Sequence, residues 1–141
     1  MSQLPPEVYS LIDAALVEDQ TFSDPTTGTL VPAEINGIGM LRAKAVGVLA
    51  GVDVVSAVFQ RVDSVVEVHP LMADGSSLSP GDDIIRVSGS AGSILRAERI
   101  ALNFLQRMSG IASDTNLYVQ AIQGCQARIV DTRKTVPGHR Y

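Results

Sequence analysis

Residues 94–123, ILRAERIALNFLQRMSGIASDTNLYVQAIQ, contain the longest helical pattern in the chain. Apolar residues at positions 94, 95, 102, 105 and 108 support one helix face, and those at 100, 104, 111 and 112 widen it. Gly110 is expected to mark a break in the helix or a close packing contact, and Gly124 is expected to cap its C-terminal end. The sequence therefore predicts a long helical region that residues 117–122 continue as a second helical segment.

The residues before this helix predict a small α+β domain that is complete by about residue 92. Residues 5–19 carry an apolar stripe with helical spacing, and residues 52–62 carry a second one. Alternating or β-rich stretches at 39–45, 65–70 and 84–89 predict strands, whereas residues 20–28 are rich in turn-forming side chains and predict a loop. The glycines at 37, 39, 47 and 51 match no phosphate-binding motif and are interpreted as turns and bulges.

The residues after the long helix predict one short strand and a polar turn. Residues 127–130, ARIV, are expected to form the strand, and DTRKTVPG at 131–138 follows it. A helix and a single strand bury little surface by themselves. We therefore expect residues 93–141 either to dock on another chain or to begin a larger domain.

Composition narrows the class of protein. The chain has 141 residues, of which 45% are hydrophobic and 18% are charged, which is typical of one globular domain. The scarcity of aromatic residues, with no Trp, predicts an aliphatic core. A single cysteine excludes an internal disulfide framework and a cysteine-based zinc site, and it fits a reducing cytosol. With no apolar run near 20 residues and no visible secretory signal, the sequence predicts a soluble cytoplasmic protein that does not bind a membrane.

Charge is distributed unevenly along the chain. The net charge of −4 argues against general nucleic-acid binding. Residues 1–95 hold four basic and twelve acidic side chains, whereas residues 96–141 hold seven basic and three acidic ones. This asymmetry indicates either an anion site near the C-terminal third or a solvated basic helix and tail.

Four side chains are the strongest candidates for binding an anion. Arg133 and Lys134 follow the predicted strand, and Thr132 lies beside them. Ligands bind at the carboxyl ends of strands in α/β folds, and an arginine can hold a carboxylate with two parallel hydrogen bonds. Arg99 lies on the long helix and is the fourth candidate, although from the residues alone a local pair of Glu98 with a neighbouring turn is the simpler interpretation. His139 could act as an acid or base, but no partner for it is apparent and a loop histidine is the simpler interpretation.

Several of these stretches resemble one family. Residues 98–112, ERIALNFLQRMSGIA, resemble the family stretch ERTALNFLQRLSGIAT, and residues 131–138, DTRKTVPG, resemble DTRKTTPG. The pair Glu18-Asp19 with DPTT at 24–27, GVLAG at 47–51, and Asp74-Gly75 with PGD at 80–82 are similar to further motifs in the same order. These motifs belong to quinolinate phosphoribosyltransferase, and the resemblance covers essentially all 141 residues.

The resemblance implies an architecture. It implies an α+β fold, with an N-terminal α/β sandwich domain at residues 1–106 and the start of an incomplete β/α barrel at 107–141. Residues 127–132 would then be the first strand of that barrel. Members of the family continue for about as long again, with metal-binding carboxylates and phosphate loops that these residues lack.

The resemblance also implies a reaction. Quinolinate attacks C1 of phosphoribosyl pyrophosphate, pyrophosphate leaves with Mg²⁺, and loss of CO₂ gives nicotinate mononucleotide. Thr132, Arg133 and Lys134 would bind quinolinate, with Lys134 also catalytic, and Arg99 would reach the site from the neighbouring subunit of a homodimer. The Mg²⁺ ligands would lie outside this chain, so we expect the 141 residues alone to show no turnover.

Two other functions remain open at this stage. The chain could belong to a related phosphoribosyltransferase-like protein linked to molybdenum transport, acting on a different base. It could also be a non-catalytic module that dimerises through its apolar helix. Small departures from the family pattern, such as Val136 in place of a common threonine, do not separate these alternatives.

Overall fold

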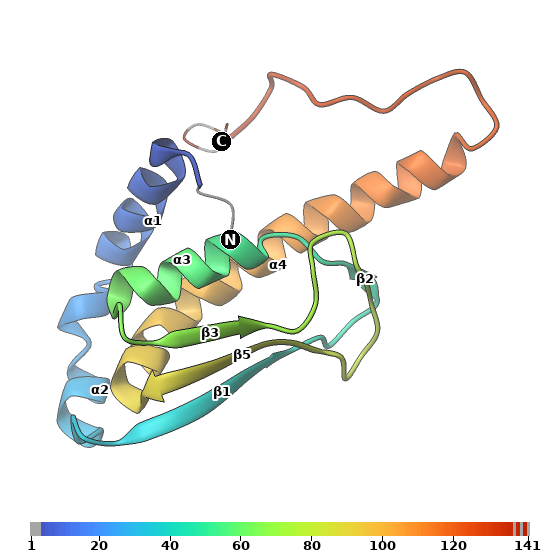
Figure 1. Ribbon diagram of the computed structural model, residues 1–141. Helices are drawn as coiled ribbons and strands as arrows, with labels where there is room; N and C mark the ends of the chain where they lie inside the picture. The colour runs from blue at the N-terminus through green and yellow to red at the C-terminus, as the bar shows by residue number, and fades with distance from the viewer. Residues whose placement is uncertain (1–3, 137, 139, 141) are drawn as a thin grey trace.

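A computed structural model describes residues 4–136, 138 and 140 (Figure 1). Helices and strands alternate irregularly along the chain, as expected for an α+β fold. Their order is α1 (Pro6–Glu18), the 3₁₀ turn η1 (Thr21–Ser23), α2 (Pro25–Leu30), β1 (Asn36–Arg42), β2 (Gly47–Val48), α3 (Val52–Val62), β3 (Glu67–Pro70), β4 (Ser77–Leu78), β5 (Asp83–Ser90) and α4 (Ala91–Ala121).

The main sheet is antiparallel and has β5 at its centre. Its strand order is β1-β5-β3, while β2 and β4 form a separate two-stranded pair. Along β5, Ile85 and Val87 are fully buried and point to the same face of the sheet, because side chains alternate in a strand. Strand β5 leads directly into α4, so the sheet fixes where the long helix begins.

The core lies between the sheet and the helices. Helix α3 packs along α4, which also contacts β1, β2 and β5, while α3 contacts β3. The largest fully buried side chains include Phe59 on α3 and Ile12 and Leu16 on α1, and Phe59 is the one aromatic side chain among the buried hydrophobic residues that the structure describes. The prediction of an aliphatic core is therefore confirmed.

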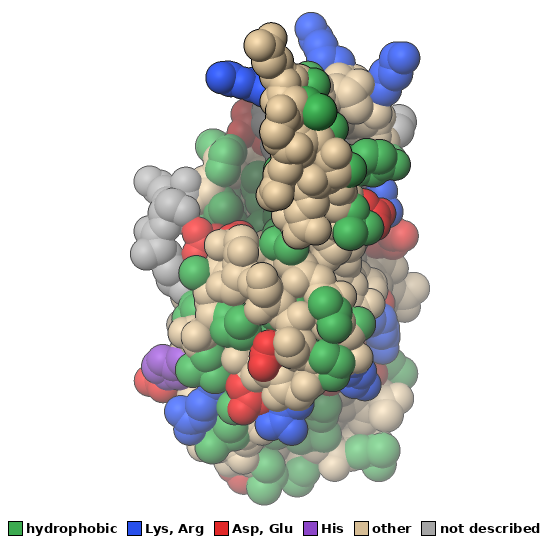
Figure 2. Space-filling view, turned by 90° about the vertical axis from the view of Figure 1, so that its right-hand side faces the viewer, with side chains coloured by type: hydrophobic (Ala, Val, Ile, Leu, Met, Phe, Trp, Pro, Cys, Tyr) green, Lys and Arg blue, Asp and Glu red, His purple; other side chains and the backbone are tan. Residues whose placement is uncertain are grey.

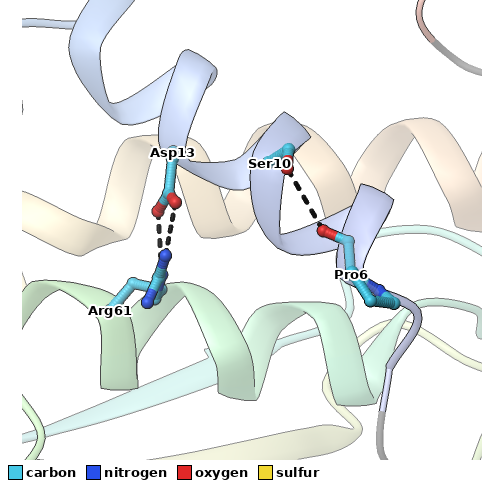
Figure 3. Close-up of polar contacts among 4 residues, drawn as sticks. All are labelled: Pro6, Ser10, Asp13 and Arg61. Atoms are coloured by element: carbon cyan, nitrogen blue, oxygen red, sulfur yellow. Dashed lines mark hydrogen bonds and ion pairs between the residues drawn. The ribbon is translucent and has the colours of Figure 1, made fainter.

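A surface ion pair fastens α1 to α3 (Figure 3). Arg61 donates from Nε to Asp13 at 2.8 Å and from a second nitrogen to the other carboxylate oxygen. The Arg61 hydrogen bond is the main cause that lowers the pKa of Asp13. Both side chains are about half exposed, so the pair contributes little to stability and serves mainly to orient α1.

Small residues allow α4 to lie close to β1 and β2. A Cβ added at Gly39 would meet the Ile94 side chain at 3.4 Å, and one at Gly47 would lie 2.7 Å from Ser113 Oγ. Ser113 and Ser109 use this proximity, because their Oγ atoms accept hydrogen bonds from the backbone of Val48 and Ala50. The interpretation of these glycines as turns and bulges is thus wrong for positions 37, 39 and 47, which lie within strands.

The structure corrects three other predictions. Residues 20–28 contain η1 and the start of α2 rather than a loop, since the Asp24 side chain caps α2 and Pro25 occupies its first turn. Gly110 does not interrupt α4, which runs unbroken from 91 to 121. Residues 127–132, predicted as a strand, are exposed and form no strand in this chain, because no neighbouring strand lies alongside them. The predicted domain boundary at 106/107 falls inside α4 and stays a prediction.

Candidate functional site

Arg99 projects from the outer side of α4 near its beginning. Ala97, Ile100 and Ala101 face the core, so the intervening Arg99 points outward and its side chain is 69% exposed. Its Nη1 donates a hydrogen bond of 2.7 Å to Asp19 Oδ1 at the end of α1, and this contact raises the pKa of Arg99. Asp19 is 18% exposed, so the more buried carboxylate holds the more exposed guanidinium in place.

Arg99 lies at the edge of a polar cleft. The cleft has a volume of about 160 Å³ and lies between η1, the first residues of α2, and α4. Its polar lining residues include the acids Asp19 and Asp24, the cations Arg96 and Arg99, and Thr21. Two segments distant in sequence, residues 19–25 and 95–99, therefore bring positive and negative charges to one small cleft.

Asp24 has a structural role at this cleft. Its carboxylate accepts hydrogen bonds from the backbone N–H groups of Thr26 and Thr27 and from the Thr27 hydroxyl. The Thr27 hydroxyl is the largest cause that lowers the pKa of Asp24, with a smaller contribution from the nearby Arg96 charge. This carboxylate serves as a helix cap, and among the described residues it accepts no hydrogen bond from Arg96.

The other three predicted site residues lie in the exposed C-terminal segment. The Lys134 backbone N–H donates to Thr132 Oγ1 at 3.2 Å, and the Arg133 carbonyl accepts from Arg140 at 3.4 Å. Figure 1 shows this segment leaving the far end of α4 and running back across the top of the molecule, and Figure 2 shows basic side chains projecting at that height. Among the described residues, no hydrogen bond or ion pair joins Arg99 to Thr132, Arg133 or Lys134. A single chain therefore does not assemble the predicted set, and its shared role stays a prediction.

The motifs that resemble the family pattern also include side chains that accept hydrogen bonds from the backbone. The Asp74 carboxylate accepts hydrogen bonds of 3.0 Å from both Gly51 and Val52 at the start of α3. The Asp82 carboxylate likewise accepts from the Ser79 backbone at 2.7 Å. These two motif residues therefore fix the backbone at the start of α3 and in the turn before β5.

Arg96 and Thr21 were not predicted as site residues, although both line the cleft beside Arg99. Arg96 precedes Arg99 by three positions, a spacing that places two side chains on the same side of a helix. That spacing was a signal in the sequence, whereas nothing local connects Thr21 with a helix that begins 70 residues later. His139 lies outside the described residues.

The described residues do not fit a metal site. No group of three or more His, Cys, Asp or Glu side chains in this part of the chain could hold a metal ion. No described helix is both long and apolar enough to cross a bilayer.

Comparison with known proteins identifies the family. The family model for the quinolinate phosphoribosyl transferase N-terminal domain matches residues 24–109. The nicotinate-nucleotide pyrophosphorylase [carboxylating] of Mycobacterium leprae is 41% identical over 132 residues, covering 92% of this chain and 46% of the relative. A probable nicotinate-nucleotide pyrophosphorylase [carboxylating] of Synechocystis is 42% identical over 98 residues, covering 70% of this chain and 33% of the relative.

Solved structures agree with the sequence comparison. NadC from Streptococcus pyogenes superposes with a TM-score of 0.90 at 38% identity, covering 97% of this chain and 49% of that one. This chain therefore spans less than half the length of these two curated relatives and about half of that solved chain. The match over residues 24–109 and the shared α+β fold show that the chain belongs to the quinolinate phosphoribosyl transferase family, as its N-terminal domain.

Proposed function

We propose that this chain supplies the N-terminal part of an enzyme that transfers a phosphoribosyl group to quinolinate. The pyridine nitrogen of quinolinate attacks C1 of phosphoribosyl pyrophosphate and displaces pyrophosphate. Loss of the 2-carboxylate as CO₂ then gives nicotinate mononucleotide. The proposal is supported by the activity for which the relatives are named and by the family match over residues 24–109.

Arg99 is the observation in this chain that carries the proposal. Quinolinate is a dicarboxylate, and a guanidinium can hold a carboxylate with two parallel hydrogen bonds. Within the described part of the chain, Arg99 donates a hydrogen bond only from Nη1, to Asp19, which leaves its other N–H groups for a ligand. The side chain is exposed at the end of α1, where it can face a second subunit.

The remaining parts of the proposal concern the assembly. In a homodimer, Arg99 of one subunit would meet Thr132, Arg133 and Lys134 of the other, with Lys134 next to the reacting base.

Mg²⁺ would accompany pyrophosphate on residues outside this chain, and the enzyme would act in the cytoplasm. Light scattering of the purified chain tests the dimer, because a stable monomer at all concentrations would contradict it.

A chimera tests the function. Residues 4–136 of this chain replace the matching part of the Mycobacterium leprae relative, and formation of nicotinate mononucleotide is measured. We expect an active chimera in which Arg99→Gln lowers kcat/KM for quinolinate by about tenfold or more, because a charged hydrogen-bond partner of the substrate is lost.

Arg61→Gln is the matched control for this experiment. It removes another arginine paired with an aspartate, but on a surface that faces α1 rather than the cleft. If Arg99→Gln and Arg61→Gln have the same small effect, Arg99 does not bind the substrate and the proposal is wrong. Quinolinate titration of the same chimera separates this function from that of a molybdenum-linked relative, which would not bind it.

A further inference from the structure

Two serines of α4 bind the backbone of the segment that begins with β2. Ser109 Oγ accepts a hydrogen bond of 3.0 Å from the Ala50 N–H and donates one of 3.2 Å to the Ala50 carbonyl. One turn further along α4, Ser113 Oγ accepts a hydrogen bond of 2.8 Å from the Val48 N–H. Paired residues of antiparallel strands exchange N–H and C=O hydrogen bonds in the same two-way manner. Ser109 therefore takes the place of a residue in a neighbouring strand, and we call these three bonds the serine contact.

The serine contact completes the hydrogen bonding of this segment. On the other side of the segment, Leu49 donates to the Ser76 carbonyl at 2.9 Å and accepts from the Gly75 N–H at 2.8 Å. Leu49 thus bonds in one direction, whereas Val48 and Ala50 bond to α4 in the other. Backbone supplies the partners on the first side, and only the two serine hydroxyls supply them on the second.

The serine contact is also the last point at which α4 is bonded to the domain. The buried side chains of α4 end at Leu105, and among the described residues Ser113 is the last one of α4 with a hydrogen bond to another element. The Thr115 hydroxyl donates only to Ile111 of the same helix. Figure 1 shows the distal half of α4, residues 109–121, passing β2 and projecting beyond the sheet. Core packing therefore holds the first half of α4, and the serine contact holds the distal half.

The direction of the distal half matters because residues 132–134 follow it in the chain. At about 1.5 Å per residue, the helix from Leu105 to Ala121 is about 24 Å long, so a tilt of about 10° at Leu105 would move its end by about 4 Å. Reacting groups that are misplaced by about 1 Å lose a large part of their rate enhancement. A contact that prevents such a tilt thus protects the placement of the side chains that follow α4.

We propose that Ser109 and Ser113 are positioning residues. Their hydroxyls fix the direction of the distal half of α4, and so the point from which the segment with Thr132, Arg133 and Lys134 starts. This role acts through the helix and needs no contact with a substrate. That the three side chains then reach quinolinate rests on the proposed function, whereas the control of the helix direction does not.

Distances between two spin labels on the 141-residue chain test the direction of the helix. The labels are attached through Ser64→Cys and Gln120→Cys, both at exposed positions, in a Cys125→Ser background that removes the single native cysteine. We expect a narrow distribution of the 64–120 distance in this background. After Ser109→Ala/Ser113→Ala the distribution should be clearly broader, because the distal half can then tilt.

Three controls accompany this measurement. A label pair from Ser64→Cys and the exposed Asn103→Cys reports on the first half of α4, and its distribution should keep its width in the double variant. Thr115→Ala removes a hydroxyl that, like that of Ser113, bonds to the carbonyl four residues earlier, and it should leave the 64–120 distribution unchanged. Ser113→Thr keeps a hydroxyl and should keep the distribution narrow. Ser113→Ala alone removes one bond to the segment and should broaden it even where the double variant does not fold.

The chimera described above measures the consequence for catalysis. We expect Ser109→Ala/Ser113→Ala to lower kcat/KM for quinolinate by about tenfold, because the binding segment is no longer held in place. Thr115→Ala should leave kcat/KM unchanged. Ser113→Thr should retain the activity that Ser113→Ala loses, since it preserves the hydroxyl.

The outcomes separate this role from the proposed function. An unchanged 64–120 distribution in a folded double variant overturns the proposal. Equal broadening for both label pairs also overturns it, because the serines then stabilise the domain as a whole. A broader distribution with unchanged kcat/KM in an active chimera overturns the positioning role and leaves the proposed function intact. An unsubstituted chimera without activity contradicts the proposed function, whereas broadening confined to the 64–120 pair still supports the control of the helix direction.

Discussion

Asp63 joins the turn after α3 to the first turn of α4. Its carboxylate accepts a hydrogen bond of 2.7 Å from the buried Ser93 hydroxyl and another of 3.0 Å from the Val65 backbone. The Ser93 hydrogen bond is the main cause that lowers the pKa of Asp63 below its ordinary value of 3.8. The contact links residues 30 positions apart, so it fixes how α4 enters the fold.

Ser93→Ala should therefore destabilise the protein in a pH-dependent way. We expect a loss of about 1–2 kcal/mol in the free energy of unfolding near pH 7, where Asp63 is ionised. A lowered pKa in the folded state stabilises above the unfolded-state pKa, and this contribution is lost as pH falls through the folded-state value. The difference between variant and wild type should thus narrow in urea unfolding measured from pH 7 down to pH 2.5.

The exposed Ser64→Ala is the control for this prediction, since its hydroxyl lies on the same turn but outside this contact. A destabilisation by Ser93→Ala that stays constant with pH would show that the hydroxyl acts through packing alone.

Residue-scale contacts between distant segments escaped sequence reasoning. Asp74 caps α3 from 22 and 23 residues away, and Asp19 meets Arg99 across 80 residues. The sequence places Asp74 in a shared motif but does not indicate its partner. Arg99 was predicted as a site residue from its motif and that role stays a prediction, whereas the cleft beside it depends on how α1, η1 and α4 pack together.

At the scale of elements, alanine substitutions at two glycines, one packed against α4 and one within it, should change the stability of the protein in opposite directions. Gly51 has a φ of +105° and a Cβ there would lie 2.8 Å from Met108 Sδ on α4. Gly110 lies inside the continuous helix, and a Cβ there would meet nothing within 4 Å. Gly51→Ala should destabilise by about 1–3 kcal/mol through backbone strain and overpacking. Gly110→Ala should stabilise by about 0.5–1 kcal/mol, because alanine favours the helix.

Thermal and urea unfolding of both variants measure these changes. Shortening the contacting side chain in Gly51→Ala/Met108→Ala should relieve only the steric part of the cost and leave the strain from positive φ. If Gly110→Ala instead destabilises, α4 must bend or make a close contact at this position, as the sequence analysis first predicted.

Helices and strands with a clear apolar period were predicted correctly. The spans 5–19, 52–62 and 94–123 closely match α1, α3 and α4, and the three predicted strands correspond to β1, β3 and β5. Helix α2 was missed because its six residues are too few to show a period, and its cap identifies it only in the structure. Residues 127–130 have the composition of a strand, but a strand also needs a neighbour, which sequence composition cannot supply.

At the scale of the whole molecule, the core and the C-terminal segment are separate. All buried hydrophobic residues that the structure describes lie between Val8 and Leu105. Beyond α4, residues 126–136 are exposed, and their described backbone makes no hydrogen bond to a helix or strand. The stability of the fold should therefore depend very little on these residues.

Limited trypsin digestion should show this separation. We expect the first cleavages after Arg128, Arg133 or Lys134, because their backbone is exposed and unpaired. Lys44 is the internal control: it also lies in an exposed loop, but the adjacent Ala43 is hydrogen-bonded at both its N–H and its carbonyl. The product ending at Arg128 should keep the thermal midpoint of the whole chain within about 2 °C, since it retains every described core residue. Slow cleavage at all three C-terminal sites, or a clearly lower midpoint for the product, would mean that the C-terminal segment packs on the domain and that its basic side chains are held there in the single chain.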